Sequence, residues 1–207
     1  MKINALHYIT TSAEAAELAC QGGVHWVQLR VKNQPPAIWK QLALDTLAVA
    51  HRYGATLIIN DNPALAREIG ADGVHLGQQD LPPAEACEML GPKAIIGGTA
   101  NTFADVQHLA AAGVDYVGLG PFRFTSTKEK LSPILGLAGY TEIMRQCQAA
   151  GITVPVIGIG GIALEDVAAL LATGLHGVAV SGAIGGAENP TEAARLFVSE
   201  LPAVKPV

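Results

Sequence analysis

Residues 114–121, Val114-Asp115-Tyr116-Val117-Gly118-Leu119-Gly120-Pro121, form an apolar, strand-like run that ends in glycine and proline. The following segment, up to Gly136, is mostly polar and carries hydroxyl, guanidinium and ammonium groups. Connections in α/β domains usually take about 2 to 6 residues, and loops beyond about 12 to 15 residues tend to be lids or binding loops. We therefore expect an anion-binding loop at the carboxyl end of a buried strand. A solvated surface loop is the alternative.

The same pattern, a short apolar run followed by an Ala- and Leu-rich helical segment, recurs along the whole chain. The predicted strands are Ala5–Ile9, His25–Arg30, Thr56–Asn60, Gly73–Leu76, Ala94–Gly98, Tyr116–Gly120, Val154–Ile159 and Gly177–Val180. The predicted helices are Ala13–Cys20, Pro36–Tyr53, Pro63–Ile69, Pro83–Leu90, Thr102–Ala112, Leu137–Ala150, Leu164–Thr173 and Thr191–Leu201. Capping residues or prolines precede several helices, and glycines end several of them. Repeated βα units of this kind predict a parallel sheet.

Eight such units closed on themselves would make a (β/α)8 TIM barrel, and 207 residues lies near the short end of the usual range. An open, doubly wound sheet is the alternative, but it gathers its ligand residues at one switch point. Here nearly every predicted strand ends in polar residues that could serve one central site, which favours the barrel. We expect a single α/β domain over residues 1–207, and the sequence leaves open whether the tail 202–207 is ordered.

Composition limits the kinds of partner. A hydrophobic content of 50% supports one well-buried core, and the formal net charge of −5 argues against a general nucleic-acid or membrane surface. The three cysteines lie far apart without a CxxC pair, and the chain shows neither a signal-peptide pattern nor a long apolar run. We therefore expect small-molecule substrates and a reducing, cytoplasmic location. The sequence leaves open whether the protein forms a homo-oligomer.

The second predicted strand ends with Gln28, Arg30 and Lys32 at alternate positions. Side chains in a strand alternate between faces, so these three point the same way, toward the barrel mouth. Two cations side by side indicate an anion with more than one charge. The alternative is that Arg30 and Lys32 pair with Asp61 or Asp80.

Strands three and four end in Asn60-Asp61 and in the run that reaches Asp80. Two carboxylates at neighbouring barrel positions, close to cations, suit Mg²⁺ that is completed by substrate phosphate oxygens. The alternative for each aspartate is a helix cap, since prolines that start helices follow both. The six histidines show no metal-ligand spacing, so we expect no metal or base role for them.

Glycines and a serine follow the last two strands, as Gly160-Gly161 and Ser181-Gly182. The first pair belongs to a G-x-G-x-x-A pattern, but no acidic residue ends the next strand, which disfavours dinucleotide binding. Barrels often build a phosphate site from the loops after strands seven and eight. We expect such a site here, assisted by hydroxyls of the 119–136 loop. A cationic subsite with a metal and a second, neutral phosphate subsite together suggest a transferase whose leaving group is pyrophosphate.

These motifs, in order along nearly the whole chain, closely resemble those of the thiamine-phosphate synthase family. They are Q-L-R-x-K at 28–32, N-D at 60–61, H-L-G-Q-x-D at 75–80, G-P-x-x-x-T-x-T-K at 120–128, G-I-G-G-I at 158–162 and V-S at 180–181. The resemblance implies a barrel that joins 4-amino-5-hydroxymethyl-2-methylpyrimidine diphosphate to a thiazole phosphate with Mg²⁺. Pyrophosphate leaves first in that family, and the thiazole nitrogen captures the resulting pyrimidine cation.

The resemblance also implies a role for each matching residue. Contacts to the pyrimidine diphosphate would come from Gln28, Arg30, Lys32, Asn60 and Lys128, of which Arg30, Lys32 and Lys128 would be catalytic. The thiazole phosphate would bind at Thr125, Thr127, Gly161, Val180 and Ser181, and Leu29, Val31, Thr99 and Ser126 complete the predicted substrate-binding set. Asp61 and Asp80 would be the Mg²⁺ ligands.

This chain departs from the family pattern at two positions. Thr99 stands where serine is usual, and Asn101 stands where histidine is common. Threonine keeps the hydroxyl, but its methyl group could change the placement of the pyrimidine ring. The related thiazole tautomerase has a histidine at the position of Pro121 and lacks the two carboxylates, so the sequence favours the synthase. A non-catalytic barrel that binds thiamine precursors is a further alternative. The sequence does not say whether the thiazole acceptor is carboxylated.

Overall fold

Eight parallel strands close into one barrel in sequence order, with β1 paired to β8. The computed structural model describes residues 3–124 and 133–202. The strands are β1 Leu6–Thr10, β2 Trp26–Leu29, β3 Thr56–Asn60, β4 Gly73–Leu76, β5 Ile95–Ala100, β6 Tyr116–Leu119, β7 Val156–Ile159 and β8 Gly177–Val180. The predicted (β/α)8 barrel is therefore confirmed, and the open sheet is excluded.

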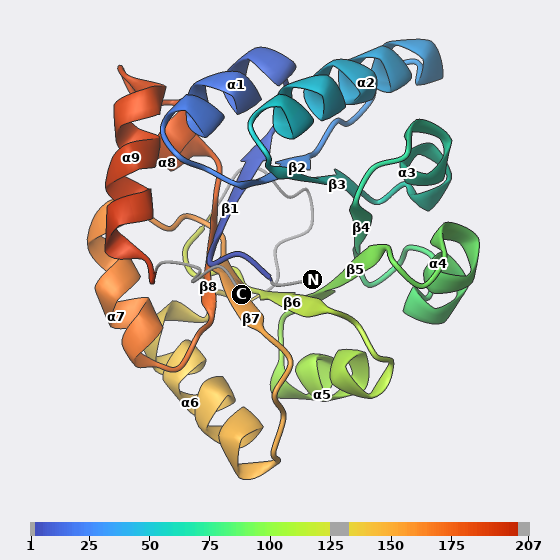
Figure 1. Cartoon of the computed structure of the whole chain (residues 1–207). Coiled ribbons are helices and arrows are strands. Elements are labelled where there is room, and N and C mark those ends of the chain that lie inside the picture. Colours follow the sequence, from blue (N-terminus) through green and yellow to red (C-terminus); the bar gives the residue numbers. More distant parts are fainter. Residues whose placement is uncertain (1–2, 125–132, 203–207) are drawn as a thin grey trace.

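Helices form an outer ring around the strands (Figure 1). They are α1 Ala13–Gln21, α2 Pro36–Arg52, α3 Pro63–Ile69, α4 Pro83–Leu90, α5 Phe103–Ala111, α6 Gly136–Ala149, α7 Val167–Ala172, α8 Gly182–Gly185 and α9 Pro190–Glu200, with a 3-10 turn η1 at Leu164–Asp166. In the part of the chain that the structure describes, none of the helices is both long enough and apolar enough to cross a membrane.

The predicted boundaries differ from the observed ones where local chemistry intervenes. β7 begins at Val156 rather than Val154, because Pro155 has no N–H to donate to a strand ladder. The predicted helix 164–173 is a 3-10 turn followed by α7. The four-residue helix α8 was not predicted, because a turn this short has no amphipathic period.

The barrel strands bury side chains on both faces, as all-parallel sheets do. One hydrophobic cluster fills the space between the strands and the helices and includes Leu29, Leu57 and Val178. A smaller cluster lies inside the barrel and contains Ile3, Ile9, Trp26, Ile58, Ile95, Tyr116, Ile157 and Ala179. The two clusters show which residues of each strand point inward, toward the site, and which point outward.

Glycine on β5 makes room for the aromatic interior. A Cβ atom on Gly97 would lie 2.2 Å from Cζ of Tyr116, so no larger residue fits there without displacing that ring. Tyr116 in turn packs edge-on against Trp26 and against His7, with ring centroids 5.5 and 5.0 Å apart. This aromatic group closes the barrel below its mouth.

Helix α5 begins with a capping box. Thr102 accepts a hydrogen bond from the backbone N–H of Asp105 at 3.2 Å, and the Asp105 carboxylate accepts from the N–H of Thr102 at 2.9 Å. We expect Thr102→Ala to lower the free energy of unfolding by about 1 kcal/mol, because one helix N–H loses its partner. Urea denaturation would measure the change. Thr141→Ala, at an exposed position of α6, is the control, and an equal loss there would contradict the capping role.

Candidate active site

The carboxyl ends of the strands surround one cavity of about 800 Å³. Its lining comes from all eight strands or the loops that follow them, and includes Ile9, Arg30, Asn60, Asp80, Thr99, Gly120, Gly161 and Ser181. Residues far apart in the sequence therefore face a single space. This is the end of the barrel where catalytic residues lie in enzymes of this fold.

The cationic residues after β2 lie in the cavity lining. Gln28, Arg30 and Lys32 all line it, as strand alternation predicts. Leu29 and Val31 were also predicted to bind substrate, but their side chains are buried in the cluster between strands and helices, on the opposite face. Only the backbone atoms of these two residues are left for a substrate contact.

Asp61 and Asp80 follow β3 and β4, the next strands of the barrel after β2, and both line the cavity. The two carboxyl groups are close enough to hydrogen-bond each other. Burial, followed by the hydrogen bond and the negative charge of Asp80, raises the pKa of Asp61 to about 6, while Arg30 lowers it. Two carboxylates that repel each other in this way are stabilised by a shared cation.

Both aspartates are free of the capping roles that were the alternative. Asn62, and not Asp61, caps α3 by accepting from the N–H of Leu65 at 2.9 Å. Asp80 accepts from the N–H of Gly77 at 2.6 Å and caps no helix, since Pro82 precedes α4. Asp61 also holds a left-handed backbone conformation with φ of 61°, which is uncommon outside glycine and is found at functional sites.

The donor set of this pair can be compared with what a metal needs. In the described residues, 3–124 and 133–202, no group of three or more His, Cys, Asp or Glu side chains comes together. The described residues therefore form no closed site of the kind that holds zinc. Mg²⁺ usually takes one or two carboxylates and completes its shell with water and phosphate oxygens, so Asp61 and Asp80 fit that ion.

His75 is a residue of the cavity that we did not predict. Its Nε2 lies 2.9 Å from the Thr99 hydroxyl, and its Nδ1 lies 3.0 Å from the Tyr116 hydroxyl, which also hydrogen-bonds Gln28. This buried network fixes the orientation of Thr99 and Gln28, two predicted substrate contacts. The histidines were dismissed on their spacing, but the inward alternation of β4 could have revealed His75.

The glycine loops follow β7 and β8, which lie across the closed barrel from β3 and β4, the strands that precede the two carboxylates. Gly160 and Gly161 have positive φ angles of 98° and 68°, a conformation that glycine adopts without strain. Val180 and Ser181 also line the cavity, and α8 starts directly after Ser181. Backbone amides at the start of a short extra helix are a common phosphate site in barrels.

Four predicted residues, and one departure from the family pattern, are still to be placed. Thr125, Ser126, Thr127 and Lys128 lie outside the residues that the structure describes. Asn101 lines the cavity, and its side-chain amide donates to the carbonyl of Gly120 at the end of β6. The asparagine therefore connects the loops after β5 and β6.

The lining joins cations, a carboxylate pair and glycine loops around one space, which defines a barrel enzyme for phosphorylated small molecules. The family model described as thiamine monophosphate synthase matches residues 4–184. A thiamine-phosphate synthase of Bacteroides fragilis is 51% identical over 179 residues, which cover 86% of this chain and 88% of that protein. One of Flavobacterium johnsoniae is 53% identical over 166 residues, or 80% and 78% of the two chains.

The chain thus belongs to the thiamine monophosphate synthase family, a family of transferases. A solved structure agrees, since thiamine phosphate pyrophosphorylase from Pyrococcus furiosus superposes with a TM-score of 0.83 and 28% identity over 94% of each chain. The 3-hexulose-6-phosphate synthase structure, with a TM-score of 0.69 and 19% identity, shares the fold alone. The tautomerase and sensor alternatives gain no support from these comparisons.

Proposed function

We propose that this chain joins the pyrimidine diphosphate to the thiazole phosphate, giving thiamine phosphate and pyrophosphate. The observation that carries the proposal is the cavity itself, where Arg30 and Lys32 face the same space as Asp61 and Asp80. Among the described residues, no salt bridge joins these cations to the two aspartates. The guanidinium and ammonium groups are therefore available for a diphosphate.

The chemistry asked of the protein is mainly electrostatic. Negative charge grows on the departing pyrophosphate, and cations fixed beside it stabilise that charge more in the transition state than in the bound substrate. We assign this role to Arg30, Lys32 and Lys128. Asp61 and Asp80 would hold Mg²⁺, which would supply further charge neutralisation at the diphosphate oxygens.

The two substrates need separate positions in the cavity. We assign the pyrimidine ring to the region of Gln28, Asn60 and Thr99, and the buried network with His75 holds the polar groups of Gln28 and Thr99. We assign the thiazole phosphate to Gly161, Val180 and Ser181, together with Thr125, Ser126 and Thr127. This arrangement would bring the thiazole nitrogen toward the pyrimidine methylene as pyrophosphate leaves on the cationic side.

A direct test is to incubate the purified protein with both substrates and look for thiamine phosphate by mass spectrometry. We expect product with Mg²⁺ and its loss with EDTA, restored by excess Mg²⁺. Product formation that EDTA does not affect would contradict the metal role. Binding of thiazole phosphate without any product would favour a non-catalytic sensor. Parallel assays with plain and carboxylated thiazole phosphates would identify the acceptor.

We also propose that the protein works in the reducing cytoplasm. Cys20, Cys87 and Cys147 are all free thiols, and Cys20 and Cys147 are buried. Burial raises the pKa of the Cys20 thiol to about 11, so the reactive thiolate form is rare at neutral pH. These properties suit a compartment in which disulfides do not form.

Lys128→Ala tests the catalytic assignment that rests on the sequence motif alone. We expect kcat to fall by about tenfold or more, because an ammonium group that stabilises the leaving pyrophosphate is lost. Steady-state kinetics with each substrate varied in turn would measure this. An effect limited to the KM for thiazole phosphate would move Lys128 to the second subsite. Lys93→Ala, at an exposed position before β5, serves as the control.

A further inference from the structure

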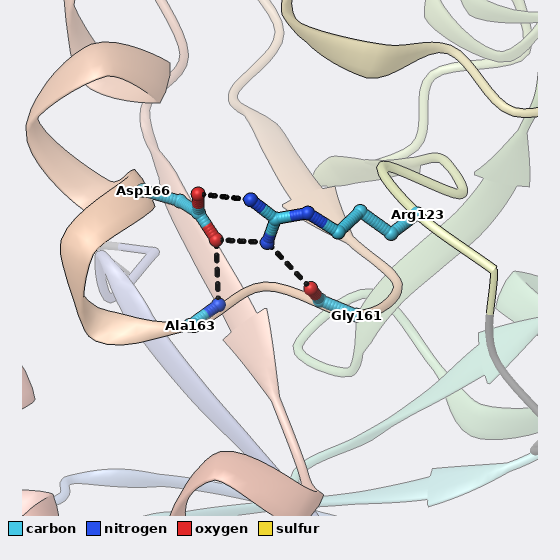
Figure 2. A network of polar contacts seen from close by, with 4 residues as sticks. All are labelled: Arg123, Gly161, Ala163 and Asp166. Carbon is cyan, nitrogen blue, oxygen red and sulfur yellow. Dashed lines mark hydrogen bonds and ion pairs between the residues drawn. The ribbon is translucent and has the colours of Figure 1, made fainter.

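An ion pair joins the loop after β6 to the loop after β7 at the barrel mouth (Figure 2). The Arg123 guanidinium donates to both carboxylate oxygens of Asp166, with Nη2 2.6 Å from Oδ1. Nη1 of Arg123 also donates to the carbonyl of Gly161 at 3.1 Å. Oδ2 of Asp166 accepts in addition from the backbone N–H of Ala163 at 2.8 Å. We call these four residues the loop latch.

The backbone beneath the latch is paired as well. At and just past the ends of the strands, the backbone N–H of Phe122 donates to the carbonyl of Ile159 and that of Arg123 donates to the carbonyl of Gly160, both at 2.9 Å. A Cβ atom on Gly160 would lie 2.7 Å from Cβ of Pro121, and one on Gly161 would lie 2.9 Å from Cβ of Arg123. The two glycines therefore pack directly against residues 121–123, and their position depends on that segment.

The ion pair of the loop latch is more buried and makes more contacts than an ordinary surface ion pair. The side chain of Asp166 is only 9% exposed, and hydrogen bonding to Arg123 holds the pKa of that carboxyl below its usual range. Arg123 is half exposed, but its guanidinium also lies over the Phe122 ring, 4.6 Å from the centroid. Bidentate pairing fixes geometry in a way that a single-point ammonium contact does not.

We propose that Arg123 and Asp166 are positioning residues for the thiazole phosphate. They hold the backbone of residues 160–163 in the conformation in which Gly161 can meet the thiazole phosphate. The proposal rests on the assignment of Gly161 to that phosphate. It adds a specific role for two residues that the motifs did not single out. Arg123 stands at an unspecified position of one motif, and Asp166 lies outside all of them.

Two single variants and their combination test the latch. Arg123→Ala removes the guanidinium, and Asp166→Asn keeps an acceptor for Ala163 but loses the charged partner. We expect each to raise the KM for thiazole phosphate about tenfold, while the KM for the pyrimidine diphosphate stays within about twofold. The double variant should be no worse than the worse single variant, because residues that act as a unit are not additive.

The Asp166→Asn result separates positioning from direct phosphate binding by Arg123. If Arg123 itself bound the phosphate, releasing it from Asp166 would leave affinity unchanged or improve it, and that outcome would overturn the proposal. Equal rises in KM for both substrates would also overturn it. Arg123→Lys keeps the charge without the bidentate geometry, and we expect it to behave like Arg123→Ala; full recovery would count against the latch.

Two further measurements keep the result interpretable. Arg145→Ala breaks an exposed ion pair with Glu142 on the neighbouring helix α6 and should leave both KM values unchanged. Thermal unfolding identifies variants that fail to fold, in which case Arg123→Lys carries the test. Isothermal titration with thiazole phosphate alone measures the same loss of affinity without catalysis. A wild-type protein that binds this ligand but makes no product would therefore refute the proposed function and not the latch.

Discussion

Asp80→Asn is expected to lower kcat by about 10²–10³, which corresponds to roughly 3–4 kcal/mol of lost transition-state stabilisation. The asparagine carbonyl can still accept the hydrogen bond from Gly77, so the loop after β4 keeps its anchor. What is lost is one of two charges that would hold Mg²⁺ beside the diphosphate. Initial rates at several Mg²⁺ concentrations would show both the lower kcat and a weaker dependence on the metal.

The matched control for Asp80→Asn is Asp45→Asn, at an exposed aspartate on α2 whose carboxylate accepts a hydrogen bond from the Gln41 side chain. This variant should retain wild-type kinetics. Near-normal turnover of the Asp80 variant at saturating Mg²⁺ would refute the metal assignment. A loss of thiazole phosphate affinity without a change in kcat would refute it too, because the carboxylate pair lies with the cationic subsite and not with the glycine loops.

Much of the fold could be predicted because prolines and glycines in the sequence indicate where helices begin and end. Prolines stand at the first turns of α2, α3, α4 and α9, and glycines follow several helices, so each βα unit is visible in the sequence. Closure was predicted from the polar residues at the strand ends. The barrel uses those residues around one cavity, whereas an open sheet would have separated them.

The site could be predicted where the alternation of side chains along a strand determines which residues face the cavity, and less well elsewhere. Gln28, Arg30 and Lys32 share a face because they alternate, which also explains why Leu29 and Val31 are turned into the core. For Asp61 the sequence favoured a metal ligand and left a helix cap as the alternative. The structure excludes the cap, because the neighbouring Asn62 takes the capping role.

Contacts between residues far apart in the chain could not be predicted from the sequence. Arg123 and Asp166 are 43 positions apart, and nothing in either local pattern indicates the other. His75 is similar, because its partners Thr99 and Tyr116 lie on β5 and β6. Such pairs depend on the register of the closed sheet. A pattern read along one strand gives the direction of a side chain but not its neighbour.

Arg30→Ala is expected to lower kcat/KM for the pyrimidine diphosphate by about 10–100-fold, because hydrogen bonds to a charged group contribute roughly 1.5–3 kcal/mol. Arg30 lines the cavity together with Lys32, and its charge acts on Asp61. Arg30→Lys should recover only part of the loss, since an ammonium group cannot bind two phosphate oxygens in the planar manner of a guanidinium. Steady-state kinetics with each substrate varied would check both variants.

The same experiment shows whether Arg30 acts on the diphosphate in particular. The KM for thiazole phosphate should stay within about twofold of wild type, because that phosphate is assigned to the neutral loops around Gly161 and Ser181. Arg52→Ala removes an exposed guanidinium on α2 that pairs with Glu17 at 3.3 Å, and it should change neither KM. Equal losses for both substrates in Arg30→Ala would mean that one cationic field serves the entire cavity, and the division into two anion subsites would then be wrong.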